Sequence, residues 1–226
     1  MSTAIITGAS RGLGLALTRT LSTRGWRLVV DARDADALAQ ATHGLGGVTA
    51  LAGDVTDPWH RSALVAAAGP EIDLLVNNAS ALGPSPQPAL AAYPVDELRR
   101  VLEVNVLSPL ALVQEALPRL RAGAAILDLS SDAAVEAYAG WGGYGASKAA
   151  LEQMTRILAA EHPQLRVHAV DPGDMNTQMH QEAFPGEDIS DRPPPEDSVP
   201  GFIALIEGDQ ASGRFQASRV APAVGA

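Results

Sequence analysis

The stretch TAIITGASRGLGLALTRTL, residues 3–21, decides the fold. It begins with TAIITG, a short apolar run that ends in glycine and is typical of a buried β-strand. The residues after it predict a helix from Gly12 to Arg24, since apolar side chains recur with helical spacing at Leu13, Ala16, Leu17 and Leu21. A strand, a glycine-rich turn and a helix in direct succession predict the first unit of a sheet covered by helices.

Strand and helix patterns keep alternating toward the C-terminus. Further strands are expected in the runs RLVVDA, GVTALAGDV, IDLLVNNAS, GAAILDLSS and RVHAVDPG. Helices are expected over residues 34–44, 58–68, 94–121 (with a break near Pro109), 145–162 and 200–206. The strands are mostly continuous apolar runs, which suits a parallel sheet buried on both faces. The sequence therefore predicts an α/β fold, a single doubly wound Rossmann-type parallel sheet with helices on both faces.

The chain is long enough for one substantial core and shows no internal repeat and no linker. It has 226 residues, 46% of them hydrophobic, so we expect a single domain over residues 1–226. One segment interrupts the alternation. Residues 174–198, DMNTQMHQEAFPGEDISDRPPPEDS, are polar, proline-rich and longer than an ordinary connection, so we expect them to form a lid or mobile loop over a substrate.

Composition excludes several classes of function. The absence of cysteine excludes disulfides, thiolate metal ligands and a cysteine nucleophile. The net charge of −10 makes the chain a poor partner for nucleic acid or an anionic membrane. No apolar run approaches the roughly 18–20 residues that span a bilayer, and the N-terminus lacks the basic region of a signal peptide, so a cytoplasmic protein is expected. No metal site is expected, because no ligand spacing connects His43, His60, His162, His168 and His180.

The glycine-rich turn is a candidate phosphate-binding site. Gly8, Gly12 and Gly14 follow the first strand and open the first helix. Glycine permits a tight turn and close approach of the backbone to a ligand, and a helix N-terminus offers free N–H groups and partial positive charge to a pyrophosphate. The alternative is a turn that is glycine-rich only for packing, but the strand–turn–helix context favours binding.

The end of the second strand, VVDAR, is the position that discriminates between the two nicotinamide dinucleotides in this kind of sheet. An acidic residue there binds the ribose 2′-hydroxyl, whereas arginine accepts a 2′-phosphate. Arg33 is expected at the tip of the strand, with Arg11 of the glycine-rich turn nearby, and two guanidinium groups suit a phosphate dianion. Asp31 leaves the opposite choice open, and Arg33 is alternatively a solvated surface charge.

A tyrosine and a lysine stand one helical turn apart at Tyr144 and Lys148. A free phenol has a pKa near 10, and a neighbouring ammonium is expected to lower the pKa and make the pair a usable proton donor and acceptor. The hydroxyls of Ser130 and Ser131 follow the fifth strand, at the edge where ligands bind in such sheets. Taken alone, the pair is equally well an ordinary exposed helix pair.

At this point the sequence closely resembles the short-chain dehydrogenase/reductase family over nearly its whole length. The resemblance rests on motifs in the family's order, namely TGASRGLG at Thr7, GDV ending at Val55, NNAS at Asn77, EVNV around Asn105, LSS at Leu129, YGASK at Tyr144 and DPGDMNT at Asp171. The separation of Ser131 from Tyr144 looks like the family spacing and selects Ser131 rather than Ser130.

The resemblance implies four catalytic residues. Tyr144 would donate a proton to the substrate oxygen in reduction and remove it in oxidation. Lys148 would lower the pKa of the tyrosine and bind the nicotinamide ribose. Ser131 would hold the substrate oxygen as charge develops, and Asn105 would help to hold a water that connects the lysine with solvent.

The resemblance also implies the contacts of the cofactor, which we expect to be NADP(H). Asp54 and Val55 would contact adenine, while Asn78 and Ala79 would line the adenosine ribose. The complete expected set is Gly8, Ser10, Arg11, Gly12, Leu13, Gly14, Arg33, Asp54, Val55, Asn78, Ala79, Tyr144, Lys148, Pro172, Gly173, Met175 and Thr177.

Two features depart from the common family pattern. Ser80 stands where the family has glycine in Asn-Asn-Ala-Gly, and only a local adjustment is expected. The C-terminus, SGRFQASRVAPAVGA, looks like that of the short-tailed carbonyl reductases and sepiapterin-reductase-like members. This ending argues against the usual tetramer, while the helices expected around residues 94–121 and 145–162 resemble the family's dimer-forming pair, so a homodimer is the default.

The sequence therefore predicts an NADP(H)-dependent oxidoreductase that reduces a ketone or aldehyde, or oxidises the alcohol. The alternatives are an NAD-dependent alcohol dehydrogenase of the same fold, motivated by Asp31, and a non-catalytic nucleotide sensor or scaffold. A hydrophobic or aromatic small-molecule substrate is indicated by the apolar residues of the expected pocket, which are Val135, Tyr138, Trp141, Met179 and Phe184. His180 is a candidate substrate contact or, alternatively, a solvent-facing loop residue.

Overall fold

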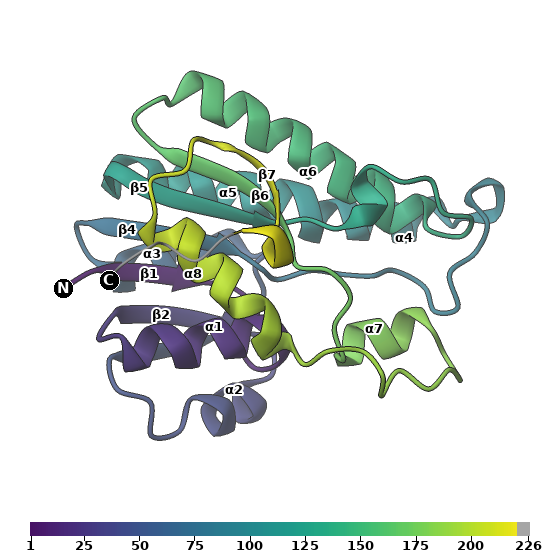
Figure 1. The fold of residues 1–226 in the computed structure, drawn as a ribbon, viewed down its shortest axis with the longest axis horizontal. Helices are drawn as coiled ribbons and strands as arrows, with labels where there is room; N and C mark the ends of the chain where they lie inside the picture. The colour runs from purple at the N-terminus through teal and green to yellow at the C-terminus, as the bar shows by residue number, and fades with distance from the viewer. Residues whose placement is uncertain (221–226) are drawn as a thin grey trace.

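Seven parallel strands form one sheet in a computed structural model that describes residues 1–220 (Figure 1). The order across the sheet is β3-β2-β1-β4-β5-β6-β7. The strands are β1 (Thr3–Ile6), β2 (Arg27–Ala32), β3 (Val48–Ala52), β4 (Ile72–Asn77), β5 (Leu120–Leu129), β6 (Arg166–Asp171) and β7 (Gly213–Gln216). The strand order reverses direction between β1 and β4, so the carboxyl ends of these two strands flank the crevice where ligands bind in such folds.

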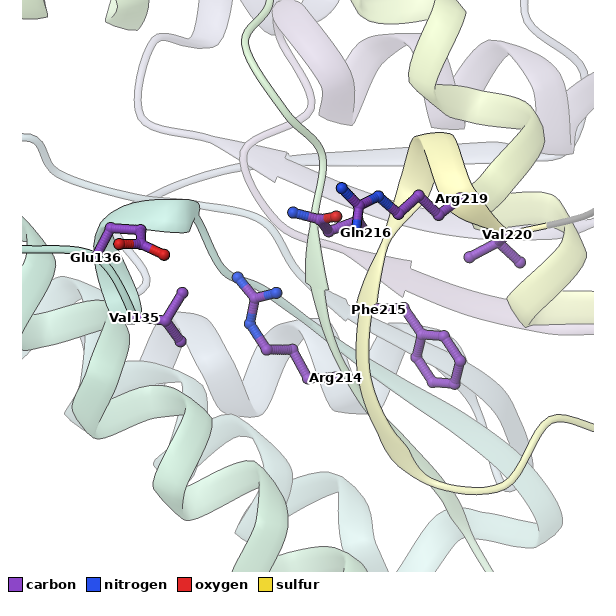
Figure 2. A pocket seen from close by; sticks show the side chains of 7 residues that line it. All are labelled: Val135, Glu136, Arg214, Phe215, Gln216, Arg219 and Val220. Carbon is purple, nitrogen blue, oxygen red and sulfur yellow. The ribbon is translucent and has the colours of Figure 1, made fainter.

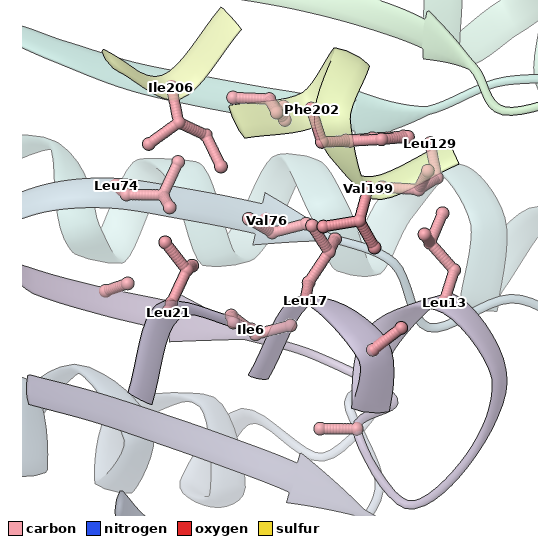
Figure 3. Packing of buried hydrophobic residues seen from close by; sticks show 14 of the residues in the cluster. Ile6, Leu13, Leu17, Leu21, Leu74, Val76, Leu129, Val199, Phe202 and Ile206 are labelled. Atoms are coloured by element: carbon pink, nitrogen blue, oxygen red, sulfur yellow. The ribbon is translucent and has the colours of Figure 1, made fainter. Parts of the chain in front are cut away.

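Helices cover both faces of the sheet. They are α1 (Gly12–Thr23), α2 (Ala35–Thr42), α3 (Pro58–Ala68), α4 (Val95–Leu102), α5 (Ser108–Ala116), α6 (Gly142–Glu161), α7 (Gln178–Ala183) and α8 (Val199–Glu207). Successive strand residues point to opposite faces, so Ile6 belongs to the core beneath α1 and α8 while Ile5 belongs to the core beneath α3 and α5. Figure 3 shows the first of these cores, in which Leu17 of α1 and Phe202 of α8 meet over Val76 of β4.

The fold class expected from the sequence is confirmed, and individual elements differ from the expectation. Strand β7 was not predicted, because GRFQ has no apolar run, and all four of its residues are only half-buried. The helical stretch over 94–121 does not break at Pro109, which lies in the first turn of α5, where a missing N–H is tolerated. It is interrupted by a π-helical turn at Glu103–Leu107, and the Ser108 hydroxyl donates to the Glu103 carbonyl across this turn.

Residues 174–198, named here the lid segment, contain α7 and a short 3₁₀ turn at Pro195–Ser198. In Figure 1 helix α7 lies apart from the two helical layers. Within residues 1–220, no helix has the length and apolar character to cross a membrane. The expected single domain and the expected short C-terminal ending both include residues 221–226, which lie outside the described residues.

Candidate active site

The glycine-rich turn joins β1 to α1 at the crevice. Gly14 of this turn is required by close packing, because a Cβ on it would lie 2.4 Å from the Gly8 carbonyl oxygen. Helix α1 begins after Arg11, and no side chain of the described residues caps its first N–H groups. These donors, together with the helix dipole, form a cradle that fits a pyrophosphate. Ser10 is half-buried in the turn and Leu13 is buried in the core.

The loop after β4 is tied to this turn. The Thr7 hydroxyl accepts hydrogen bonds from the backbone N–H groups of Asn78 and Ala79, both at 3.0 Å. The Asn78 side-chain amide donates to the carbonyls of Thr7 and Gly8 at 2.8 and 3.0 Å. The structure therefore brings Asn78 and Ala79 against the glycine-rich turn.

Asp31 does not lie at the tip of β2. Its carboxylate is 1% exposed; one oxygen accepts the Gly8 N–H at 2.8 Å, and the other lies 3.0 Å from His60 Nε2. His60 was not among the sequence-predicted site residues, because its partner is 29 residues away in the chain and no local pattern connects them. The contacts leave the tip of β2 to Arg33, which is exposed.

Arg33 and Asp54 belong to the same end of the crevice. Partial burial raises the pKa of Asp54, but hydrogen bonds from Thr56 and the positive charges of Arg33 and His60 leave that pKa below its usual value. Val55 is buried beside Asp54. The guanidinium of Arg11, in the glycine-rich turn, donates to Gln178 Oε1 of α7. Arg11 therefore contacts the lid segment.

Tyr144 and Lys148 lie near the N-terminal end of α6, which begins at Gly142 rather than at the expected Gly145. They are not an exposed helix pair, because Tyr144 is 9% and Lys148 is 2% exposed. The Lys148 ammonium donates to the Leu129 carbonyl at 2.6 Å and lies 5.5 Å from the centre of the Tyr144 ring. The two side chains expected to act together are therefore neighbours at the carboxyl end of β5.

Ser131 begins the turn after β5, and helix α6, which carries Tyr144, approaches this turn very closely. A Cβ on Gly145 would lie 2.6 Å from the Ala133 carbonyl, so only glycine allows this contact. Ala133 and Tyr144 share one small hydrophobic cluster. The Ser131 hydroxyl donates to Asp132 Oδ1 at 2.9 Å. Ser130 is instead buried and donates to Glu152, which supports the choice of Ser131 from the family spacing.

Asn105 lies in the π-helical turn and connects the loop after β4 with α6. Its side-chain oxygen accepts from the Ala81 N–H at 2.7 Å and from the Ser80 hydroxyl at 3.1 Å. Its amide donates to the Ala81 carbonyl at 2.8 Å and to the Ser147 hydroxyl at 2.9 Å. Ser80, expected to cause only a local adjustment, thus gives Asn105 an additional partner.

The protonation of Tyr144 differs from the sequence-based expectation. Burial raises the pKa of Tyr144, the carboxylates of Asp171 and Asp132 raise it further, and a hydrogen bond with Ser80 acts in the opposite direction. The sequence predicted that the pKa of Tyr144 would be lowered beside Lys148; the pKa is raised instead, because desolvation of the phenolate dominates. Burial also lowers the pKa of Lys148 to about 8, while Asp128 raises it. Tyr144 consequently remains a neutral phenol, able to donate a proton, at neutral pH.

The lid segment covers Tyr144. Met179 and Ala183 of α7 pack against the cluster that contains Tyr144, together with Trp141. The Trp141 ring centre lies 5.9 Å from that of Tyr144 and 5.8 Å from that of Phe184. The Ser85 hydroxyl donates to the Glu182 carbonyl at 2.6 Å and holds α7 from the other side.

The remaining residues expected to contact substrate or cofactor lie in or near the lid segment. His180 is not solvent-facing, since its ring lies 4.9 Å from Phe184 and its side chain is 11% exposed. Val135 and Tyr138 are exposed. The DPG turn is held by a hydrogen bond from the Gly173 N–H to Asp171 at 3.0 Å. The Ser198 hydroxyl donates to the Pro172 carbonyl. Met175 packs against the core beneath α1, and Thr177 is the N-cap of α7.

The arrangement has no feature of a metal centre among residues 1–220, where no group of three or more His, Asp or Glu side chains is placed to hold an ion. It does place a phenol, an ammonium and a hydroxyl together at the edge of the sheet, beside a phosphate cradle. These are the groups needed to exchange a proton with an oxygen of a bound molecule.

Comparisons with known proteins agree with this geometry. A family model described as short chain dehydrogenase matches residues 2–188. The rhamnolipids biosynthesis 3-oxoacyl-[acyl-carrier-protein] reductase of Pseudomonas aeruginosa is 34% identical over 195 residues, covering 78% of this chain and 73% of that protein. A benzil reductase of Saccharomyces cerevisiae is 34% identical over 192 residues, covering 79% of this chain and 73% of that protein.

Solved structures have the same fold. A short chain dehydrogenase from Pseudomonas syringae superimposes with a TM-score of 0.89 at 28% identity, covering 96% of this chain and 94% of that chain. One from Shigella flexneri, determined in complex with NADP, gives a TM-score of 0.86 at 27% identity, covering 96% of each chain. One from Escherichia coli, in complex with NADPH, gives 0.87 at 28% identity with the same coverage.

Proposed function

The chain belongs to the short-chain dehydrogenase family, and from this premise we propose that it is an NADP(H)-dependent reductase that converts a ketone or aldehyde into an alcohol, or catalyses the reverse reaction. As a family member it is an oxidoreductase that uses a nicotinamide cofactor. The observation that carries the finer proposal is the buried, neutral Tyr144 beside Lys148 and Ser131. Because its pKa is raised, Tyr144 carries at neutral pH the proton that a reduction requires.

Each of the proposed catalytic residues has its own role in the reaction. The cofactor supplies the hydride when bound. Tyr144 donates its proton to the substrate oxygen, and the positive charge of Lys148 stabilises the phenolate that remains. The Ser131 hydroxyl turns from Asp132 to the substrate oxygen and stabilises its developing negative charge. Asn105 holds the loop after β4 and α6 together, which keeps Tyr144 in place.

Three observations support NADP(H) over NAD(H). Asp31 is engaged by Gly8 and His60, so its carboxylate does not occupy the tip of β2. Arg33 is exposed at that tip and suits a 2′-phosphate. Two solved structures of similar fold were determined with NADP or NADPH. In this assignment the glycine-rich turn holds the pyrophosphate, Asp54 and Val55 contact adenine, and Pro172, Gly173, Met175 and Thr177 flank the nicotinamide.

The substrate in this proposal is a hydrophobic or aromatic carbonyl compound. Met179 of the lid segment and Trp141, at the start of α6, pack against Tyr144. Phe184 of the lid segment lies against Trp141, and the His180 ring lies against Phe184. The lid opens to admit the substrate and then excludes water from the reacting atoms. One relative is named for the reduction of benzil, which is in keeping with an aromatic substrate.

The proposal treats residues 1–226 as one domain that acts as a homodimer. Leu107, at the junction of the π-helical turn and α5, is 50% exposed, and Ile157 of α6 is 46% exposed. Both lie on elements that the family resemblance assigns to dimer contacts. Light scattering of the wild type, with Ile157→Glu as the disrupting variant, tests this part.

The function is tested with a panel of aromatic and aliphatic ketones and aldehydes, using NADPH and NADH in parallel, with wild type and Ser131→Ala. The proposal predicts NADPH-dependent reduction by the wild type and a loss of about two orders of magnitude in Ser131→Ala. Equal activity with NADH and with NADPH, each at a low cofactor concentration, would favour the NAD-dependent alternative. Nucleotide binding without turnover of any substrate, in either direction, would favour the sensor or scaffold.

A further inference from the structure

Two buried carboxylates lie beside the proposed catalytic residues and take no part in the reaction described above. Glu152 is one helical turn after Lys148, as Lys148 is one turn after Tyr144, so the three side chains share one buried face of α6. Asp171 ends β6 and begins the DPG turn. Only 2% of Glu152 and 3% of Asp171 is exposed. A carboxylate at such a position is costly unless it is paired and hydrogen-bonded.

Arg214 of β7 pairs with both carboxylates. Its Nε donates to Glu152 Oε1 at 2.8 Å, and its Nη2 lies 3.3 Å from Asp171 Oδ2. The same Nη2 also donates to the backbone carbonyl of Ser131 at 3.3 Å. Burial lowers the pKa of Arg214, but Glu152 and Asp171 leave the pKa above its ordinary value, so the guanidinium is a permanent cation.

The partners of Arg214 belong to three different segments of the site. Glu152 also accepts from the Ser130 hydroxyl, next to Ser131. Asp171 also accepts from the Gly173 N–H within the DPG turn. One guanidinium thus connects the segment that carries Ser131, the helix that carries Tyr144 and Lys148, and the turn proposed to flank the nicotinamide. The planar fork of arginine is suited to such a fixed, multiple contact.

The other side of Arg214 borders a cavity of about 450 Å³ (Figure 2). Its lining residues are Val135, Glu136, Arg214, Phe215, Gln216, Arg219 and Val220. Figure 2 shows the Arg214 guanidinium directed toward Val135 and Glu136, which follow Ser131 in the chain. The Arg214 side chain therefore lies between this cavity and the buried carboxylates.

We propose that Arg214 is a positioning residue for the reaction, which fixes Ser131 and the DPG turn relative to α6 and offsets the negative charge of Glu152 and Asp171 next to Tyr144. The inference rests on the proposed function of Ser131 and Tyr144. Arg214 touches neither substrate nor cofactor in this account. It acts through the Ser131 carbonyl, Glu152 and Asp171.

Two consequences separate this role from general structural support. Loss of the guanidinium in Arg214→Gln displaces Ser131 and the DPG turn, so kcat falls by about tenfold or more while KM for the carbonyl changes little. It also leaves Asp171 without its counter-charge. Since Asp171 already raises the pKa of Tyr144, the variant requires a higher pH for alcohol oxidation, in which Tyr144 must accept a proton.

Arg214→Lys is the conservative variant and Arg166→Gln is the control. Lysine retains the charge but not the fork, so Arg214→Lys keeps the wild-type pH profile and recovers only part of kcat. Arg166 of β6 stabilises the end of α8, because it donates to the carbonyls of Leu205, Ile206 and Gly208. It has no proposed role in the reaction. Arg166→Gln is expected to lower Tm and to leave the pH profile and NADPH affinity unchanged.

The experiment compares these three variants with the wild type by calorimetric NADPH titration, kcat and KM, and the pH profile of alcohol oxidation. We expect NADPH binding to weaken severalfold in Arg214→Gln and not in Arg166→Gln, a readout that needs no substrate and stands even if the wild type reduces no carbonyl. The inference is overturned if Arg214→Gln lowers Tm as Arg166→Gln does but leaves NADPH affinity, kcat and the pH profile at wild-type values. If Arg214→Gln does not fold, a wild-type kcat and NADPH affinity in Arg214→Lys would overturn the positioning role.

Discussion

The backbone N–H of Gly8 donates to the carboxylate of Asp31 across 2.8 Å, which fixes the glycine-rich turn to the end of β2. The second carboxylate oxygen of Asp31 is held by His60 at 3.0 Å. An acidic residue near the end of β2 is ordinarily a sign of ribose binding. In this chain the carboxylate instead supports the glycine-rich turn, which we propose holds the pyrophosphate, so Asp31 contributes to the shape of the site.

Asp31→Ala is expected to weaken NADPH and NADH binding by a similar factor. It removes the partner of the half-buried Gly8 N–H and of His60, and leaving a buried polar group without its hydrogen-bond partner lowers the free energy of unfolding by about 1–3 kcal/mol. Urea unfolding and calorimetric titration with both nucleotides measure the two effects. A selective loss of NADH binding would show that Asp31 reaches the ribose after all.

Arg33→Ala is expected to weaken NADPH binding by about 10- to 100-fold, the effect of losing one charge-assisted hydrogen bond, and to leave NADH binding nearly unchanged. Arg19→Ala is the matched control, because Arg19 is an exposed arginine of α1 in the same part of the molecule. It changes the net charge equally but removes no phosphate contact. Equal weakening of both nucleotides by Arg33→Ala would contradict the 2′-phosphate assignment.

The pKa of Lys148, lowered by burial to about 8, predicts the pH dependence of reduction. Lys148 is charged below this pKa and neutral above it. Because the charge stabilises the phenolate, kcat/KM for NADPH should be constant through neutral pH and fall with unit slope above about pH 8. Lys148→Arg, which stays charged, should extend the plateau to higher pH. A wild-type plateau that continues past about pH 9 would contradict the prediction.

His168 predicts an acid sensitivity unrelated to catalysis. Neither ring nitrogen has a hydrogen-bond partner among the described residues, and the ring packs edge-on against Phe215 at 5.3 Å. Burial, with a smaller contribution from Arg166, lowers the pKa of His168 to about 4. The unfolded chain therefore binds the proton first, and stability falls as pH drops below the unfolded pKa of about 6.5.

Urea unfolding at about pH 7.5 and pH 5 measures this effect, which should reach about 2 kcal/mol. His168→Leu should remove most of the difference between the two pH values, whereas His43→Gln, at an exposed position in the connection after α2, should not. An unchanged difference in His168→Leu would show that another group governs acid sensitivity.

The fold was predictable because its signals are local. Apolar runs such as IDLLVN and the helical spacing of Leu13 and Leu17 depend only on nearby residues, and their burial in the structure follows the pattern. Strand β7 escaped prediction because GRFQ is short and half-buried and is defined by pairing with β6. The π-helical turn at Glu103–Leu107 likewise has no signature in the residues alone.

The sequence offers candidate residues for the site, but the contacts that connect them could not be read from it. The family motifs identified Tyr144, Lys148, Ser131 and Asn105, and the structure brings the segments that carry them together. The partners of Asp31 and Arg214 lie 23 to 83 residues away, so no spacing in the sequence reveals them. The pKa of Tyr144 was expected to fall, since its helical neighbour Lys148 is visible in the sequence while its burial is not.

A single-turnover measurement with Tyr144→Phe tests the central claim most directly. Enzyme loaded with NADPH is mixed with a ketone that the wild type reduces, and the decay of the reduced cofactor is followed. The account predicts that the variant binds NADPH as tightly as the wild type while its rate of cofactor oxidation falls by about 10²- to 10⁴-fold, the contribution of a general acid. Equal rates in the two proteins would contradict Tyr144 as the proton donor and, with it, the proposed mechanism.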